Sequence, residues 1–407
     1  MDSELLNFLA AAVIILVAAK LGGYVSIRLG QPSVLGELLV GIILGPTVLN
    51  MLGGWPLFAG DDHLSASLTL FAEIGVILLM FLAGLELDLR DLLRSGRVAG
   101  LAGALGVIVP LAGGFLTARL FGVETVEAIF IGLALSATSV SISAQTLMEL
   151  GVLRSKVGLG LLGAAVFDDI LVVLLLSGAS VVFGAADSGT SLGIILLRMV
   201  LFLVGASAVG VYVVPRLMAR VEELPVSQAV PTAALVLCFL FAWASEALGG
   251  MAAITGAFMA GLFLARTPYA HQIESRLAAL AYGLFVPIFL VNIGLQANLR
   301  AISGAAWYLA IALTVVAIIT KVAGSGLGAL AGGFNRRESL QLGVGMISRG
   351  EVGLIVASVA LRADLLTPEV FSGVVFMVIV ATLVTPPLLR LAYRDDAPTP
   401  AVSPRPE

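Results

Sequence analysis

Charged residues are scarce in this sequence, and their scarcity indicates the class of protein. Asp, Glu, Lys and Arg make up 12% of the chain, whereas hydrophobic residues make up 59%. A soluble globular domain carries about 25% charged residues, so a water-soluble fold of this composition would leave much apolar surface in water. A bilayer removes the problem because lipid-facing side chains can stay apolar. The composition therefore predicts an all-α polytopic membrane protein.

Cysteine, histidine and basic tracts are also rare. The single cysteine, Cys238, lies in an apolar run, which excludes a disulfide framework and a cysteine metal cluster. His63 and His271 lie far apart in polar connectors, so we expect neither a resident metal nor a cofactor. The net charge of −4, without a basic stripe, argues against a nucleic-acid partner. No nucleophile–base motif or nucleotide loop is evident, so the sequence does not predict an enzyme.

Long apolar runs take up most of the chain instead. A helix needs about 20 apolar residues to cross the hydrocarbon core, and division at polar and Gly/Pro clusters gives about thirteen such runs. The predicted spans are 5–27, 34–52, 66–90, 97–120, 125–147, 156–183, 192–219, 227–246, 249–266, 276–298, 304–333, 338–361 and 369–394. The first run follows no basic segment, so we expect a retained helix rather than a signal peptide.

The arginines give the orientation. Alternate connectors hold most of the basic residues, and the opposite set holds only Arg119, Arg300 and Arg362. By the positive-inside rule the basic side is cytoplasmic. This places the N-terminus outside and the C-terminus in the cytoplasm of a multi-pass protein of the cell (inner) membrane. The Pro-rich end, 395–407, is expected to be a disordered tail.

Short patterns recur in the two halves of the chain. Residues 36–44 read GELLVGIIL and 256–264 read GAFMAGLFL, while 84–90 read GLELDLR and 294–300 read GLQANLR. The matched segments are in the same order, and each second copy lies seven predicted helices after the first. Because seven is odd, the second copy enters the membrane with inverted topology. Inverted repeats are typical of secondary transporters, which bind their ion at the midplane between the repeats.

Two adjacent carboxylates interrupt one apolar run. Asp168 and Asp169 lie in the middle of the predicted helix 156–183. A charge at the bilayer centre costs about 2.5–3.5 kcal/mol or more, so such residues are usually functional. Neighbours on a helix point about 100° apart, which allows one carboxylate to meet a cation while the other pairs with a different helix. Like charges this close also separate their proton affinities. A structural pair with buried partners is the alternative.

A lysine lies in the middle of a second apolar run. Lys321 has more than a dozen mostly apolar residues before it in the span 304–333. This depth makes a snorkelling interfacial lysine the weaker alternative. We expect Lys321 to be a counter-ion to one of the two aspartates.

Two further segments look interrupted. Arg349 and Glu351 flank a glycine in GMISRGEVGLIVA, and Thr138 and Ser139 lie in LALSATSVSIS. The two segments are again seven helices apart, and interrupted helices in matching positions indicate a transporter site. Unwound carbonyls and the hydroxyls of Thr138 or Ser139 suit a hard cation, which prefers oxygen ligands. A packing role for the Ser/Thr stretch and a structural Arg349–Glu351 ion pair remain the alternatives.

Together these strings resemble a known family over nearly the whole chain. QPSVLGELLVGIILGP, the FDD that ends at Asp169, Lys321 in a TK-x-x-G setting and ISRGEVGLI are similar to the monovalent cation:proton antiporter-2 family, especially its NapA-type bacterial sodium/proton antiporters. The resemblance implies the NhaA/NapA-like fold of two inverted six-helix repeats with two broken, crossing helices. It implies dimerisation-domain helices in 1–96 and 226–303, a core (ion-transport) domain in 97–190 and 304–394, and a linker helix in 191–225.

The resemblance also assigns roles. It implies that Asp169 is the principal ion-binding carboxylate, that Asp168 pairs with Lys321, and that Thr138 is an accessory ligand. The implied activity is electrogenic exchange of Na⁺ or Li⁺ for protons by an elevator-type movement of a homodimer. A potassium/proton antiporter of the Kef-like branch and a sodium-coupled organic-anion symporter on the same fold are the alternatives.

Overall fold

The computed structural model describes residues 3–29, 31–58, 62–85, 96–183, 192–296, 300, 304 and 306–394. In these ranges all of the regular secondary structure is helical, and no strand is present. In the first half the helices are α1 (Ser3–Arg28), α2 (Ser33–Leu44), α3 (Met51–Gly54), α4 (Asp62–Leu85), α6 (Gly96–Leu120), α7 (Thr125–Ser136), α8 (Val140–Glu149) and α9 (Lys156–Val182). The second half begins with α10 (Leu192–Ala208), η1 (Val209–Val213), α11 (Val214–Glu222), α12 (Ala229–Ala244), η2 (Ser245–Gly249), α13 (Ala253–Leu264), α14 (Ala270–Leu280), η3 (Ala281–Phe285) and α15 (Val286–Leu295). It ends with α16 (Ala306–Gly332), α17 (Arg336–Gly345), α18 (Glu351–Arg362) and α19 (Pro368–Ala392).

Each predicted run has a helical counterpart in the structure. In the described ranges, 10 helical segments are long and apolar enough to cross a membrane, and α2 and α13 are shorter apolar helices. The broken pair α17–α18 accounts for the remaining predicted run. Three spans contain a π-helical turn (η1, η2 and η3) that the hydrophobic pattern did not predict. The run 34–52 is shorter than expected, because α2 ends at Leu44 before the Gly45–Pro46 pair.

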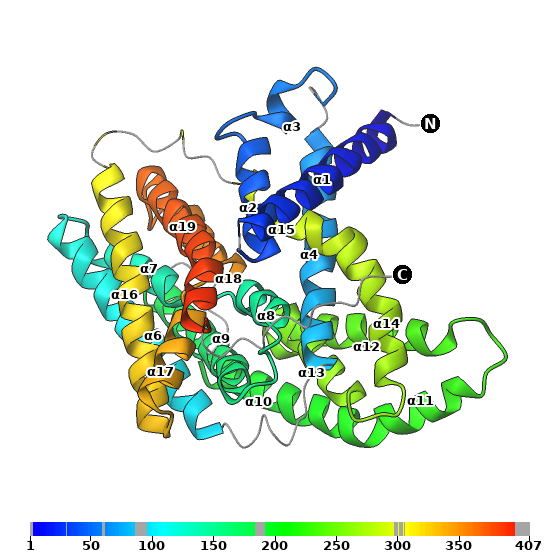
Figure 1. The fold of residues 1–407 in the computed structure, drawn as a ribbon. Helices are drawn as coiled ribbons and strands as arrows, with labels where there is room; N and C mark the ends of the chain where they lie inside the picture. Colours follow the sequence, from blue (N-terminus) through cyan, green and yellow to red (C-terminus); the bar gives the residue numbers. More distant parts are fainter. Residues whose placement is uncertain are drawn as a thin grey trace.

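The helices form two groups that meet in the middle of the molecule (Figure 1). On one side α6 packs along α16 and against α7 and α9, and α16 also contacts α17 and α19. On the other side α4 packs against α13 and α15, while α2 packs against α1 and α15. Helix α8 lies between the groups, with contacts to α9 and α19 and also to α2 and α4. Residues that meet across this boundary therefore come from distant parts of the sequence.

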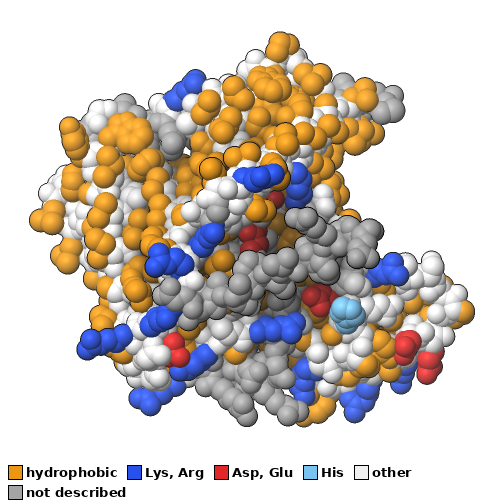
Figure 2. Space-filling model, viewed as in Figure 1, with side chains coloured by type: hydrophobic (Ala, Val, Ile, Leu, Met, Phe, Trp, Pro, Cys, Tyr) orange, Lys and Arg blue, Asp and Glu red, His pale blue; other side chains and the backbone are white. Residues whose placement is uncertain are grey.

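The surface is apolar over the sides of the helices. Leu201 and Val204 of α10 are 61% and 64% exposed, and Val13 and Leu21 of α1 are 62% and 60% exposed. In the view of Figure 2, hydrophobic side chains cover the upper part of the molecule, and most of the visible Lys and Arg side chains lie below them. Exposed apolar helix faces with basic residues gathered at one end are typical of a multi-pass membrane protein.

The repeated glycines make equivalent contacts. Helices α2 and α13 both contain 12 residues, and their motif glycines occupy the same positions. A Cβ at Gly41 would lie 2.2 Å from the Val291 carbonyl oxygen on α15, and a Cβ at Gly261 would lie 2.0 Å from the Phe81 carbonyl oxygen on α4. Only glycine permits backbones to approach so closely. Helix α2 therefore crosses α15 as α13 crosses α4, so each copy of the motif packs closely against a helix from the other half of the chain.

Two spans are interrupted, as the sequence suggested. Helix α7 ends at Ser136 and α8 begins at Val140, while α17 ends at Gly345 and α18 begins at Glu351. The interruptions lie against each other, because the Ser139 backbone N–H donates to the Ser348 carbonyl at 3.0 Å. The breaks expose helix ends inside the protein, where their unpaired backbone groups need partners.

Candidate ion-binding site

Helix α9 carries both aspartates into the protein interior. Its first turn is capped by Ser155, whose side chain accepts a hydrogen bond from the Gly158 backbone N–H at 3.1 Å. Asp168 is 0% exposed and Asp169 is 9% exposed. The angular separation of neighbouring helix residues gives the two carboxylates different surroundings. Asp168 faces α16, whereas Asp169 lines a cavity.

Lys321 and Asp168 form a fully buried ion pair. Lys321 Nζ lies 2.9 Å from Asp168 Oδ1, and both side chains are 0% exposed. The same ammonium donates to the Gly106 carbonyl at 2.7 Å and to the Ser136 carbonyl at 2.8 Å. An ammonium has three protons, so these three acceptors satisfy it. Ser136 is the last residue of α7, and a cation there compensates the partial negative charge of that helix end.

Small residues on α6 permit this pairing across three helices. A Cβ at Gly106 would lie 2.4 Å from Ser325 Oγ of α16, and a Cβ at Gly103 would lie 2.8 Å from the Ala164 carbonyl oxygen of α9. Larger side chains at either position would push α6 away from a neighbour. The glycines thereby hold α9 and α16 close enough for a direct contact between their buried charges.

The second oxygen of Asp168 has spare capacity. Within the described residues Asp168 Oδ2 is buried and accepts no hydrogen bond. A buried, unsatisfied carboxylate oxygen is costly, and such an atom in a native fold calls for an explanation such as a bound ion or a catalytic role. Asp168 can therefore keep Lys321 through one oxygen while the other oxygen receives a proton or a cation.

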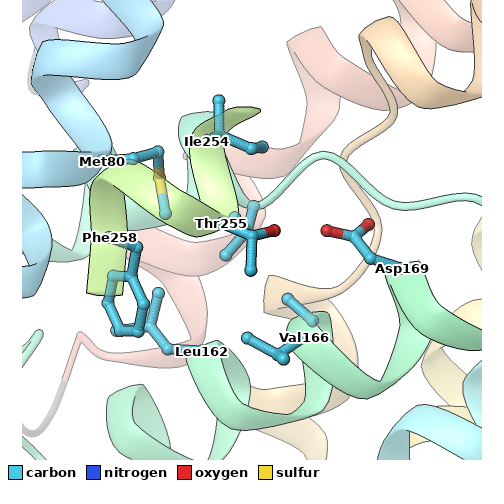
Figure 3. A pocket seen from close by; sticks show the side chains of 9 residues that line it. Met80, Leu162, Val166, Asp169, Ile254, Thr255 and Phe258 are labelled. Atoms are coloured by element: carbon cyan, nitrogen blue, oxygen red, sulfur yellow. The ribbon is translucent and has the colours of Figure 1, made fainter. Parts of the chain in front are cut away.

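Asp169 lines a small cavity between the two groups of helices. The cavity encloses about 270 Å³ of empty space, which includes adjoining solvent. Its wall is formed by side chains from α4, α8, α9 and α13, namely Met80, Val140, Leu162, Ala165, Val166, Asp169, Ile254, Thr255 and Phe258. Figure 3 shows the Asp169 carboxylate and the Thr255 hydroxyl pointing toward each other across it. Except for Asp169 and Thr255, the wall is made of hydrocarbon and thioether groups.

Thr138 and Ser139 lie at the crossing of the broken helices. Thr138 is 4% exposed, and its hydroxyl oxygen is buried without a hydrogen-bond partner among the described residues. Ser139 is held by backbone, because its N–H donates to Ser348 and its carbonyl accepts from the Ser348 hydroxyl. The arrangement leaves the Thr138 hydroxyl available as a ligand, and the Ser139 backbone is bonded to Ser348 at the crossing.

Arg349 is bonded to backbone carbonyls, two of them at the end of α17. Its guanidinium is fully buried and donates to the carbonyls of Met346 and Ile347 at 3.1 and 3.2 Å, and to that of Ala317 at 3.5 Å. It therefore compensates the C-terminal end of α17 as Lys321 compensates that of α7. The side chain of Glu351 lies outside the described residues, so the expected Arg349–Glu351 pair stays a prediction.

Thr255 is a site residue that sequence reasoning missed. The signal was available in the repeat, because Thr255 directly precedes Gly256 and corresponds to Leu35 before Gly36. The two copies differ here, because Thr255 carries a hydroxyl where Leu35 carries a hydrocarbon side chain. The symmetric packing of the two copies does not explain this difference. The Gly106 and Ser136 carbonyls could not have been found in this way, since any residue supplies a carbonyl.

A buried lysine–carboxylate pair beside the crossing of two broken membrane helices is the arrangement expected of an ion transporter. Comparison with known proteins then gives the family. The model of the family described as "Sodium/hydrogen exchanger, transmembrane" matches residues 13–391. The chain therefore belongs to this family of cation/proton antiporters.

Relatives match along nearly their whole length. The chain is 44% identical over 388 residues to the Na(+)/H(+)-K(+) antiporter GerN of Bacillus cereus, covering 95% of this chain and 96% of the relative. It is 37% identical over 386 residues to a Na(+)/H(+) antiporter of Enterococcus hirae, covering 95% and 98% of the two chains. All these names describe transport.

Solved structures agree on the fold. Two structures of the sodium proton antiporter MjNhaP1 from Methanocaldococcus jannaschii superpose with TM-scores of 0.75 and 0.69, at 18% and 17% identity. They cover 100% and 97% of this chain, and 100% and 98% of the solved chains. The predicted antiporter fold is thereby confirmed.

Proposed function

We propose that this antiporter exchanges Na⁺, or Li⁺, for protons at a site formed by Asp169, Asp168 and Lys321. The observation that carries the proposal is the buried Lys321–Asp168 pair at 2.9 Å, directly beside a second carboxylate that lines a cavity. A carboxylate exposed to a cavity can exchange a proton for a cation. The paired carboxylate next to it gives the site a second acid, with Lys321 as its counter-ion.

In this mechanism sodium and protons compete for one site. Sodium binds Asp169, recruits the second oxygen of Asp168, and weakens the contact between Asp168 and Lys321. On the other side of the membrane, protons displace sodium and the ion pair forms again. Neutralising the carboxylates before movement avoids carrying bare charge through lipid. If one net charge crosses per cycle, a membrane potential supplies about 2.3 kcal/mol per 100 mV to the exchange.

We further propose that the movement is of the elevator type. The core would comprise 97–190 and 304–394, and it would slide against the dimerisation-side helices of 1–96 and 226–303 in a homodimer. The packing supports this division, because α6 and α16 make their main contacts within one group while α4 and α13 make theirs within the other. We place the protein in the cell membrane with the N-terminus outside and the C-terminus in the cytoplasm.

The Asp169→Asn variant tests the core of this proposal. In proteoliposomes under a sodium gradient, the variant should lose sodium-dependent proton flux, because an amide neither titrates nor carries the charge that attracts the cation. Asp364→Asn is a matched control, since this aspartate lies in the loop before α19. Sodium-dependent flux at the wild-type rate in Asp169→Asn would remove Asp169 from the mechanism.

Potassium is the second candidate ion. The name of the relative GerN includes K⁺ beside Na⁺ and H⁺, and carboxylate and hydroxyl oxygens can bind either cation. Selectivity depends on cavity size and the number of oxygen ligands, so exchange measured across Li⁺, Na⁺ and K⁺ decides between them. An organic-anion symporter is disfavoured, because Arg349 bonds to backbone carbonyls and is not among the residues that line the cavity.

A further inference from the structure

We propose that Thr255 is a cation ligand of this site, placed on the wall opposite Asp169. The inference rests on the proposed cation/proton exchange at Asp169 and extends it to a helix outside the proposed core. Thr255 lies in the first turn of α13, is 5% exposed, and directs its hydroxyl into the cavity toward the Asp169 carboxylate (Figure 3).

The composition of the cavity wall makes the hydroxyl chemically useful. A cation that leaves water for this cavity must replace hydration oxygens with protein oxygens. Of the nine side chains in the wall, Asp169 and Thr255 carry oxygen, and the others are hydrocarbon or thioether. A hard cation held by Asp169 therefore finds its additional side-chain oxygen on α13. The contact can be direct or can pass through one retained water.

The start of α13 does not itself require a threonine. Helix α2 begins with the same geometry, because the Leu35 backbone N–H donates to the Pro32 carbonyl at 3.2 Å as the Thr255 N–H donates to the Ala252 carbonyl at 3.0 Å. Both helices have 12 residues and lack a side-chain cap bond. The equivalent position therefore accepts leucine in one copy of the repeat. The hydroxyl in the other copy serves the cavity and not the helix.

The place of Thr255 in the fold also gives its role a direction. Asp169 is carried by α9, which packs against α6, whereas α13 packs against α4 and α12. If α9 shifts with the core, Asp169 moves and Thr255 stays with α13. The threonine then completes the cation shell in one conformation and is left behind in the other. Cation affinity would accordingly be higher on the side to which this cavity opens.

Substitution of the hydroxyl by a methyl group isolates this role. Thr255→Val keeps the shape of the side chain and should raise the KM for Na⁺ about five- to tenfold, the effect expected for one lost oxygen contact to a charged group. Thr255→Ser keeps the hydroxyl and should keep a KM near the wild-type value, and in Thr255→Val the KM should change more than turnover at saturating sodium. Thr314→Val is the matched control, since Thr314 is also 5% exposed and donates to the Ala310 carbonyl of its own helix at 2.7 Å.

The experiment is sodium-dependent proton flux in proteoliposomes, with the sodium-induced rise in melting temperature as an independent binding assay. An unchanged KM and an unchanged sodium dependence of melting in Thr255→Val would overturn the inference. Absence of cation-dependent flux in the wild-type protein would instead overturn the proposed function. If Thr255→Val does not fold, Thr255→Ala gives the same two measurements. Flux assayed separately from each membrane face should show the change in KM on one face, and an equal change on both faces would overturn the directional role.

Discussion

Glu149, the last residue of α8, accepts two hydrogen bonds from Ser33, the first residue of α2. The Ser33 backbone N–H donates at 2.8 Å and its hydroxyl at 2.5 Å. A carboxylate at a helix N-terminus is favourable, because it satisfies an unpaired N–H and compensates the positive end of the helix. Nearby, the Tyr282 hydroxyl lies 3.6 Å from Met148 Sδ. The contact between Ser33 and Glu149 joins α8 of the proposed core to α2 of the proposed dimerisation side.

An elevator movement must break the contact between Ser33 and Glu149. In a Cys238→Ala background, a Ser33→Cys/Glu149→Cys pair joined by a short, reducible thiol cross-linker should abolish exchange, and reductant should restore it. Lys156→Cys/Glu338→Cys is the matched pair, because Lys156 and Glu338 form an exposed ion pair at 2.9 Å between two helices of the proposed core. The same cross-linker there should leave exchange intact. Full exchange by the cross-linked first pair would rule out this relative movement.

Removal of Lys321 should affect both voltage dependence and stability. In Lys321→Gln, Asp168 loses its buried counter-ion, and breaking a buried pair costs about 3–5 kcal/mol. Exchange that persists should carry less net charge, as measured by currents on supported membranes. Lys156→Gln is the control, since this exposed pair contributes about 0–1 kcal/mol. Unchanged charge movement in Lys321→Gln would reject the electrogenic role of the lysine.

The Thr138 hydroxyl should contribute to function and not to stability. Because this buried oxygen has no hydrogen-bond partner among the described residues, Thr138→Val should keep or slightly raise the melting temperature while it weakens sodium binding. Thr382→Val gives the contrast, because the one proton of the Thr382 hydroxyl is shared between the Arg349 and Val378 carbonyls. That variant should lower the melting temperature. Wild-type sodium affinity in Thr138→Val would assign Thr138 to packing.

Competition between protons and sodium predicts the pH dependence of exchange. As pH falls, more of the site carboxylates are protonated and cannot bind sodium, so the apparent KM for Na⁺ should rise. Once the site is mostly protonated, mass action gives about a tenfold rise per pH unit for one competing proton and a steeper rise for two. Turnover at saturating sodium should change less. A KM that is independent of pH in proteoliposomes would contradict a shared site.

Much of the fold could be predicted because hydrophobicity is a local property. The helix α9 could be placed from its own residues, and so could the interruptions at Ser139 and Arg349. The lengths of α2 and α13 and the π-helical turns were not predicted, since they depend on contacts with neighbouring helices. The repeated glycines indicated the symmetry of the halves, although not which helices cross at Gly41 and Gly261.

The sequence alone determined that this protein spans a membrane many times and buries two acids and a lysine, because the cost of charge in lipid acts on each segment separately. The resemblance of its motifs to an antiporter family supplied the expectation that Asp168 pairs with Lys321. Only the tertiary structure decided that the pair is direct, that the Gly106 and Ser136 carbonyls complete it, and that Thr255 faces Asp169. These contacts join residues as far apart as 215 positions, and they depend on how helices rotate and cross, which no single segment encodes.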